Sequence, residues 1–402
     1  MDRRDFCTRA GAAALSFTIL GREAVHGTQA NSRVRLGMIG AGGRGTWLTP
    51  LFQKHGGYEI AAVADYFQDR VDAFGEKFGV PPQRRFTGLA GYRRLLEAGV
   101  DAVAIESPPY FHPEQAEAAV AAGAHVYLAK PVAVDVPGCR TVSESAARAA
   151  ERKLVCLVDF QTRAHPLFVE AVTRIHKGAI GEIVFGEATY HADCPFQQWF
   201  DLLQKDPGNP ESRLRGWGLD RALSGDMITE QDIHTLDVMS WIMDKPPLGA
   251  IGCAGLKARP RIGDCSDHFV VLYQYPDGVG IQFSGRQFKG HGTQEGIRNR
   301  MFGSRGVLES EYGGEVLVRG EQFFRGGKTS NIYEEGAVAN IAAFHEAIAK
   351  GDVSNPTVAP SVLSTLVSIL GRNAAYANRL ITWDELTADR RRLIPKLDGL
   401  RG

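Results

Sequence analysis

Residues 226–243 place a histidine between two carboxylates at spacings that suit acid–base chemistry. Their apolar side chains recur with a helical period, so Glu230, His234 and Asp237 fall at positions i, i+4 and i+7 on one face. A carboxylate four residues away can orient an imidazole and support its cationic form. His234 is therefore a candidate proton acceptor and Glu230 its candidate catalytic partner, although a histidine on a half-buried helix can also be purely structural.

Lys130 is a second candidate catalytic residue. It follows the apolar run 125–128, which predicts a buried strand, and it precedes Pro131. An ammonium group at a strand end could hold a substrate oxygen and stabilise an alkoxide while a hydride leaves. A solvated surface lysine is the alternative, and the position of this strand end decides between the two.

A glycine-rich turn early in the chain predicts the nucleotide that such chemistry requires. The apolar run 34–39 is followed by G-x-G-x-x-G at 40–45, and the next apolar run, 60–64, ends in an acid. This order of strand, glycines, helix and acid is typical of a dinucleotide site, where glycines allow a tight turn and bring backbone N–H groups close to a pyrophosphate. The candidate cofactor-binding residues here are Gly40, Gly42, Gly43, Arg44, Gly45 and Asp65.

Asp65 indicates which dinucleotide binds. Its carboxylate can accept hydrogen bonds from both ribose hydroxyls of NAD, and it would repel the 2′-phosphate of NADP. Arg44 offers a positive charge that keeps NADP possible. We therefore expect NAD as the cofactor, with NADP as the alternative.

The elements that must position these residues alternate between short apolar strands and helices. Strands are predicted at 34–39, 60–64, 101–105, 125–128 and 154–158, with helical segments between them. Such alternation predicts a parallel sheet that binds its ligands at the carboxyl ends of the strands. That rule brings Pro108 and His112, which follow the strand at 101–105, to the same crevice as Lys130 and Pro131.

The second part of the chain predicts a different class of domain. A strand with an alternating pattern at 182–190, a hairpin around the turn 276–278 and further strands up to residue 319 predict an open, mainly antiparallel sheet. We therefore expect a Rossmann α/β dinucleotide-binding domain at 31–159, followed by an α+β substrate-binding and oligomerisation domain at 160–402.

Together these motifs resemble the Gfo/Idh/MocA family of NAD(P)-dependent sugar and cyclitol oxidoreductases. Lys130-Pro131 is similar to the end of the family's Glu-Lys-Pro motif, with Ala129 in place of the glutamate. The resemblance implies that Lys130 is functional. The alanine removes the carboxylate that the family usually carries beside this lysine.

Residues 230–237 resemble the family's Asp-x-Gly-x-His-x-x-Asp motif. Glu230 stands for the first aspartate and Asp232 for the glycine, while His234 and Asp237 match. The resemblance implies that His234 accepts the proton of the substrate hydroxyl. The two departures leave the subfamily, and hence the substrate, open.

Substrate contacts are expected from polar residues where the second domain begins. Gln161 and Arg163 match a polar pair that the family often shows, and they could reach substrate hydroxyls or tie the two domains together. Trp199 and Trp217 could stack on a sugar or serve packing alone. The candidate substrate residues are Gln161, Arg163, Tyr190, His191 and Asp237.

The amino-acid composition indicates that the protein's binding partner is a small molecule. The 402 residues include 46 basic and 46 acidic ones, so the chain has no charge field to recruit nucleic acid or acidic lipid. Its six cysteines show no spacing typical of zinc, so no metal site is expected, and the presence of a disulfide stays open. The expected partner is a sugar or cyclitol.

Residues 1–30 predict a twin-arginine export signal. Arg3-Arg4 is followed by the apolar stretch 10–20, and residues 28–30 offer a cleavage site. We expect a periplasmic or otherwise exported protein; a disordered basic leader is the alternative. No later run approaches the roughly 18 apolar residues of a membrane helix, so no integral membrane segment is expected in the mature chain.

These observations predict an NAD(P)-dependent oxidoreductase that transfers a hydride between nicotinamide and a sugar or cyclitol hydroxyl. Because an exported protein finds no pool of free NAD, we expect the dinucleotide to be tightly bound. The rival is an NAD-dependent glycoside hydrolase acting by transient oxidation and elimination, for which Tyr190 and His191 could supply an acid–base group. Lys130 and His234 disfavour a noncatalytic nucleotide-binding protein. The exposed face of the second sheet predicts a homo-oligomer.

Overall fold

Six parallel strands form the first sheet and carry the predicted nucleotide turn. The computed structural model describes residues 33–402, and the predicted export signal at 1–30 lies outside the described residues. The strand order β3-β2-β1-β4-β5-β6 is typical of dinucleotide-binding folds. The strands are β1 Val34–Ile39, β2 Tyr58–Asp65, β3 Arg85–Thr87, β4 Ala102–Ile105, β5 His125–Ala129 and β6 Cys156–Asp159. The predicted parallel sheet is confirmed; the short, half-buried β3 was not predicted.

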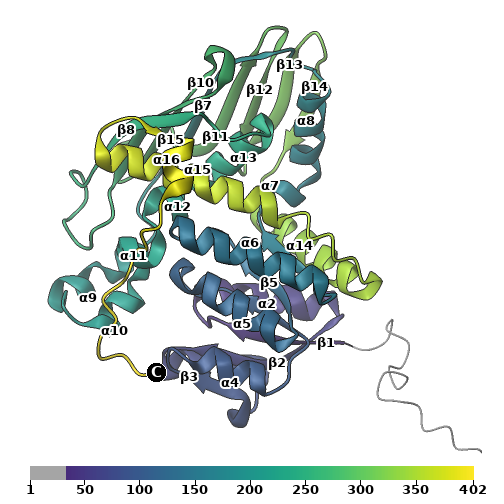
Figure 1. Cartoon of the computed structure of the whole chain (residues 1–402), viewed down its shortest axis with the longest axis vertical. Helices are drawn as coiled ribbons and strands as arrows, with labels where there is room; N and C mark the ends of the chain where they lie inside the picture. Colours follow the sequence, from purple (N-terminus) through teal and green to yellow (C-terminus); the bar gives the residue numbers. More distant parts are fainter. Residues whose placement is uncertain (1–32) are drawn as a thin grey trace, which may run out of the picture. The chain divides into compact units, whose positions relative to one another are not determined.

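Helices cover both faces of this sheet (Figure 1). They are α2 Gly43–His55, α3 Gln68–Phe78, α4 Gly91–Glu97, α5 His112–Ala122, α6 Val136–Glu151 and, from much later in the chain, α14 Ile332–Lys350, with the short turns η1 Pro82–Arg84 and η2 Pro109–Phe111. The hydroxyl of Tyr58 donates to the carbonyl of Ile341 at 2.8 Å, and the rings of Phe344 and Tyr127 lie 5.6 Å apart. Helix α14 therefore completes the hydrophobic core of the first domain.

The second sheet is open and mainly antiparallel, as predicted. Its order is β14-β13-β12-β11-β7-β10-β9-β8-β15, and within this sheet of the described residues only the β7–β10 pair is parallel. The strands are β7 Ile183–Ala192, β8 Gly249–Gly255, β9 His268–Gln274, β10 Gly280–Gln287, β11 Gly296–Gly303, β12 Gly306–Glu311, β13 Glu315–Gly320, β14 Phe324–Lys328 and β15 Ile381–Thr382, with η5 Pro276–Gly278 in the β9–β10 turn.

Helices cover one face of the second sheet. These are α8 Pro166–His176, α13 Ile233–Met243 and α15 Val358–Ala377, and the short α7 Gln161–Ala164 connects them to the first domain. The opposite face exposes Phe185, Val270 and Leu272. The predicted homo-oligomer stays a prediction, which light scattering would test.

The prediction of a single helix at residues 226–243 is wrong. Helix α12 Met227–Glu230 and helix α13 are separated by Gln231 and Asp232. The N–H of Asp232 donates at 2.9 Å to the carbonyl of Met227, five residues back, so this turn is wider than an α-helical turn. Glu230 therefore lies in α12, before the break, and His234 in α13, after it.

Two segments that the sequence did not predict lie over the first domain. Residues 193–224 form the short helices η3 Gln197–Trp199, α9 Phe200–Lys205, α10 Pro210–Arg215, η4 Trp217–Leu219 and α11 Arg221–Ser224. After α16 Trp383–Ala388, the chain runs down beside them to its last residue (yellow in Figure 1). The N–H of Leu89 donates to the carbonyl of Arg401 at 3.0 Å. This last stretch, 389–402, is called the tail below.

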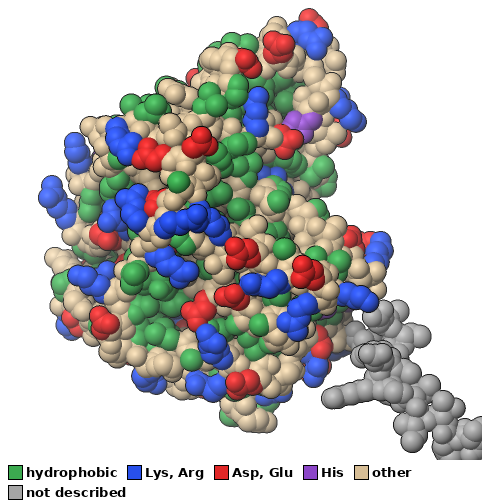
Figure 2. Space-filling view, viewed as in Figure 1, with side chains coloured by type: hydrophobic (Ala, Val, Ile, Leu, Met, Phe, Trp, Pro, Cys, Tyr) green, Lys and Arg blue, Asp and Glu red, His purple; other side chains and the backbone are tan. Residues whose placement is uncertain are grey.

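The described surface mixes charges of both signs. On the face drawn in Figure 2, acidic and basic side chains are interspersed rather than gathered by sign. Among residues 33–402, no helix is both long enough and apolar enough to cross a membrane. The five cysteines in this range are free.

Candidate cofactor and active site

A cavity of about 300 Å³ lies at the carboxyl ends of β1, β2 and β4. The glycine turn forms part of its wall, as predicted. Gly40 has a φ of +101°, and a Cβ there would lie 2.6 Å from the backbone of Glu106. A Cβ on Gly45 would lie 2.0 Å from the carbonyl oxygen of Gly40. Only glycine fits either position, so the turn keeps its backbone open to a ligand.

The predicted cofactor residues divide between this wall and the layer behind it. Those that line the cavity are Gly40, Gly42, Gly43, Arg44, Asp65 and Pro108. The carboxylate of Asp65 accepts from the N–H of Ala41 at 2.9 Å and from that of Phe67 at 3.0 Å. These two bonds hold the carboxylate at the end of β2, where its remaining lone pairs can accept from ribose hydroxyls. The cradle therefore fits a dinucleotide.

Arg44 lines the cavity but turns its guanidinium inward. Nη2 bonds to Asp159, and the guanidinium lies 4.8 Å from the ring of Trp47 and 4.7 Å from that of Tyr333. Burial opposes its charge, but Asp159 and Glu106 raise the pKa of Arg44 above its ordinary value. The suggestion that Arg44 could hold a 2′-phosphate does not fit this placement.

Lys130 reaches from the first domain into the second. Its Nζ donates to the carbonyl oxygen of Glu230 at 2.5 Å and to Oε1 of the same residue at 3.2 Å, and the Lys130–Pro131 peptide is cis. Gln231 donates to the other carboxylate oxygen of Glu230. The structure thus brings Lys130 and Glu230 together, and it corrects the expected pairing of Glu230 with His234.

The surroundings of His234 favour its neutral form. Nδ1 is buried without a hydrogen-bond partner among residues 33–402, and the imidazole lies 5.4 Å from the ring of Tyr312. Burial, and then the charges of Lys130 and Arg44, hold the pKa of His234 well below its ordinary value. The expected support for a cationic imidazole is therefore wrong, but a neutral imidazole is the form that accepts a proton.

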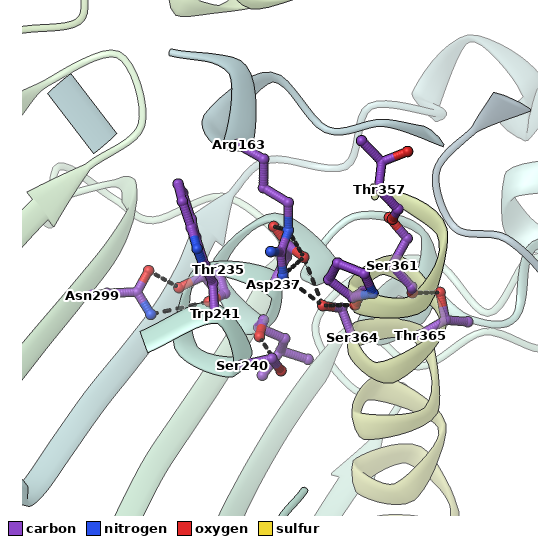
Figure 3. A network of polar contacts seen from close by, with 12 residues as sticks. Arg163, Thr235, Asp237, Ser240, Trp241, Asn299, Thr357, Ser361, Ser364 and Thr365 are labelled. Atoms are coloured by element: carbon purple, nitrogen blue, oxygen red, sulfur yellow. Dashed lines mark hydrogen bonds and ion pairs between the residues drawn. The ribbon is translucent and has the colours of Figure 1, made fainter. Parts of the chain in front are cut away.

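Arg163 and Asp237 bind each other rather than facing a ligand (Figure 3). Nε of Arg163 donates to the two carboxylate oxygens of Asp237 at 2.9 and 3.0 Å, and Ser364 Oγ donates to Asp237 at 2.6 Å. The carboxylate of Asp237 is 0% exposed. Between the two roles considered for Arg163, the geometry favours tying α7, α13 and α15 together, and Asp237 is misplaced for a substrate residue.

Gln161 and His112 also lie behind the cavity wall. Gln161 is buried against Gly336 of α14, and its Nε2 donates to Asp159 at 3.2 Å. The ring nitrogens of His112 lie 2.7 Å from the carbonyl oxygen of Pro131 and 2.8 Å from that of Ser107. Burial lowers the pKa of His112 to about 4. His112 therefore fixes two strand-end loops instead of lining the cavity.

Tyr190 and His191 lie on opposite faces of β7, as neighbours in a strand must. Tyr190 is buried on the helix-covered face, and its hydroxyl donates to Gln231 Oε1 at 2.7 Å. His191 lies 3.0 Å from Ser284 Oγ and lines a groove on the uncovered face with Glu187 and Arg298. The structure therefore separates His191 from Lys130 and His234, contrary to the prediction.

Sequence reasoning missed Glu106 and Arg215, which line the cavity. Glu106 follows β4 directly and lines the cavity, and the strand-end rule used for Pro108 could have found it. Trp199 and Trp217, considered for sugar stacking, line the same cavity as the glycine turn. Arg215 lies 3.9 Å above the ring of Phe67 and forms a 2.7 Å ion pair with Asp69. No sequence pattern links residues 196–217 to this site.

Comparison with known proteins places these features in one family. Residues 34–160 match the oxidoreductase family with an NAD-binding Rossmann fold, and residues 168–309 match the GFO/IDH/MocA C-terminal domain. The solved structure of levoglucosan dehydrogenase in complex with NADH and levoglucosan shares the fold, with a TM-score of 0.69, 19% identity, and coverage of 87% of this chain and 99% of that one.

Two curated relatives show how far the sequence similarity extends. Inositol 2-dehydrogenase of Rhizobium meliloti is 23% identical over 280 residues, which span 69% of this chain and 76% of that protein. A glycosyl hydrolase family 109 protein of Solibacter usitatus is 30% identical over 175 residues, which span 40% of this chain and only 38% of the hydrolase. Since the two family matches together cover more than half of the chain, it belongs to the Gfo/Idh/MocA oxidoreductase family.

Proposed function

We propose that this protein is an NAD-dependent dehydrogenase of a sugar or cyclitol hydroxyl. The observation that carries the proposal is the contact of Lys130, which follows β5, with Glu230 of the second domain. The charge of Lys130 also lowers the pKa of His234 and so favours its neutral form. The glycine cradle and Asp65 supply a dinucleotide site. Lys130, Glu230 and His234 do not line this cavity, but the charge of Lys130 acts on Glu106, a residue that does. Similarity to inositol 2-dehydrogenase supports the substrate class.

The chain's own residues divide the chemistry between them. The ammonium of Lys130 holds the substrate oxygen and stabilises negative charge on it, and Glu230 keeps that ammonium in position. The neutral imidazole of His234 accepts the hydroxyl proton. When bound, the nicotinamide supplies the hydride acceptor.

His234→Ala tests this division of roles. We expect turnover to fall by about 10²- to 10⁴-fold, because a positioned base is lost, while dinucleotide affinity stays within about twofold. The measurement is NADH formation with a panel of monosaccharides and inositols, on protein whose folding is checked by circular dichroism. His191→Ala is the matched control, since His191 lies on the other face of β7. Equal turnover in the two variants would remove His234 from the mechanism.

Glycoside hydrolysis by transient oxidation is the second candidate. The similarity to a glycosyl hydrolase family 109 protein favours it, whereas the separation of His191 from the site leaves only Tyr190 of its two proposed acid–base groups. Release of a chromophoric aglycone without net NADH would support the hydrolase. Net NADH with a free sugar would support the dehydrogenase.

We further propose that the dinucleotide is tightly held and that the protein is exported. Six residues of segment 196–217 line the cofactor cavity, and the tail packs against residues of its wall, which supports retention. Export depends on residues 1–30, and cell fractionation of a variant with Arg3→Lys and Arg4→Lys tests it: the variant should stay in the cytoplasm if the twin-arginine signal operates.

A further inference from the structure

Among residues 33–402, three arginines line the cofactor cavity, and one of them lacks an acidic partner. Arg44 bonds to Asp159, and Arg215 forms an ion pair with Asp69 at 2.7 Å. Arg70, in the first turn of α3, forms no side-chain hydrogen bond or ion pair with any described residue. An arginine in this state can offer its N–H donors to an anionic ligand.

The guanidinium of Arg70 reaches the glycine turn. A Cβ added to Gly42 would have one atom within 4 Å outside its own segment, Nη1 of Arg70 at 3.6 Å, and a Cβ added to Gly43 would have none. The guanidinium also lies 5.0 Å from the ring of Phe67, a contact that holds it at this wall. The side chain of Arg70 is half-buried rather than sealed. The space in front of the turn is therefore open, and Arg70 borders it.

Asp65 lies at the same turn. Its carboxylate accepts from the N–H of Ala41, the residue before Gly42. Burial raises the pKa of Asp65, and the positive charge of Arg70 is the largest influence in the opposite direction. An acid that suits a ribose hydroxyl and an arginine that suits a phosphate thus lie at one corner of the cavity.

The charges of Asp65 and Arg70 act in opposite directions on a group at the 2′ position of the adenosine ribose. The carboxylate accepts from the hydroxyls of NAD and repels the 2′-phosphate of NADP, whereas a nearby arginine attracts that phosphate. The N–H groups of Ala41 and Phe67 offset part of the negative charge of Asp65. The planar fork of an arginine can also bond two phosphate oxygens at once. Repulsion and attraction of similar size leave little preference between the two cofactors.

We propose that Arg70 determines cofactor specificity and admits NADP to this cavity beside NAD, by binding the 2′-phosphate next to Asp65. The inference rests on the proposed function, but it concerns the adenosine end of the cofactor and not the residues that act on the substrate. Arg70 thus takes the role that the sequence suggested for Arg44.

Displacement of bound NADH by NAD⁺ and by NADP⁺, followed at equilibrium by NADH fluorescence, gives the ratio of the two affinities without any substrate. The two ligands differ only in the 2′-phosphate, so this ratio isolates its binding. The wild-type protein should bind NADP⁺ within about tenfold of NAD⁺, since the two opposing charges lie at the same turn. Arg70→Ala should weaken NADP⁺ binding by about tenfold or more, because a charge-assisted contact is lost, and change NAD⁺ binding by no more than about twofold.

Two further variants keep the test decisive. Lys77→Ala removes an exposed cation from the other end of α3 and should leave the affinity ratio at its wild-type value. Arg70→Lys keeps the charge but loses the planar fork, so it should retain part of the NADP⁺ binding if Arg70→Ala folds poorly.

Two results would overturn the inference and leave the proposed function standing. One is an unchanged ratio in a folded Arg70→Ala variant, including equal weakening of both ligands, which would place Arg70 against a group that NAD⁺ and NADP⁺ share. The other is a wild-type affinity for NADP⁺ more than about tenfold below that for NAD⁺. Failure of the wild-type protein to bind any of the three dinucleotides would overturn both the inference and the proposed function.

Discussion

His234 is an imidazole held neutral by its neighbours. Burial and the charges of Lys130 and Arg44 all disfavour its cation, so the pKa lies well below the ordinary histidine value. The nearest ring, that of Tyr312, offers no compensating negative charge. At neutral pH such an imidazole is uncharged, and one of its ring nitrogens is free to accept a proton.

This setting predicts the acid limb of the pH–rate profile. A base must be neutral to act, so activity falls as pH drops through its pKa, and here that fall should be centred clearly below pH 6.5, the ordinary value. The measurement is kcat/KM against pH with the best substrate of the sugar and inositol panel. A limb centred at or above pH 6.5 would show that the acting base is not the buried imidazole described here.

At the residue scale, the sequence predicted which residues line the site better than it predicted where their side chains point. The glycine turn, Asp65 and Pro108 were found because the strand-end rule depends only on the order of strand, turn and helix. Arg44 and His191 were misplaced because their side chains depend on packing: a single residue step in β7 separates Tyr190 from His191. The partner of Glu230 lies 100 residues away in sequence, and no local pattern reveals it.

At the scale of elements, a polar junction holds α7, α13 and α15 together where the second domain begins. The buried Arg163–Asp237 pair links α7 to α13, and Ser364 adds α15 (Figure 3). The guanidinium of Arg163 also lies 5.2 Å from the ring of Trp241, on the same helix as Asp237. The helical spacing predicted Asp237 on a functional face, but the break at residues 231–232 separates the start of that helix from the rest.

Asp237→Asn therefore tests whether Asp237 stabilises the fold or binds the substrate. Loss of the carboxylate leaves the nearly buried Arg163 unpaired, which should destabilise the protein by about 3–5 kcal/mol. The measurement is the shift of the urea unfolding curve, followed by circular dichroism. Asp101→Asn, which breaks the exposed pair with Arg35, is the control and should cost no more than about 1 kcal/mol. A weakened substrate affinity with unchanged unfolding would instead return Asp237 to the substrate site.

At the scale of the whole molecule, the cofactor cavity is enclosed by segments that come from three parts of the chain. The first domain supplies the cradle, and residues 196–217 cover it through the Asp69–Arg215 ion pair and the 2.8 Å hydrogen bond from Tyr66 to Glu211. The fold class of both domains could be predicted from strand patterns alone. This enclosure could not, because it depends on contacts between irregular segments that carry no periodic signal.

The tail supports this enclosure from behind. Leu397 and Leu400 pack with Tyr66, Phe67 and Trp217, three residues that line the cavity. The N–H of Arg401 also lies 3.4 Å from the hydroxyl oxygen of Tyr66. Opening the cavity between Phe67 and Trp217 would disturb this apolar cluster, so the tail should slow the release of a bound dinucleotide.

Leu397→Asp combined with Leu400→Asp should therefore speed cofactor release by roughly tenfold or more, since two partly buried leucines lose about 1.4 kcal/mol or more of apolar contact. Stopped-flow displacement of NADH, followed by its fluorescence, measures the rate. Ile394→Asp is the matched control, because Ile394 lies on the same tail but is 75% exposed, and its release rate should equal that of wild type. If the double variant also released NADH at the wild-type rate, the tail would have no part in retention, and the enclosure would depend on segment 196–217 alone.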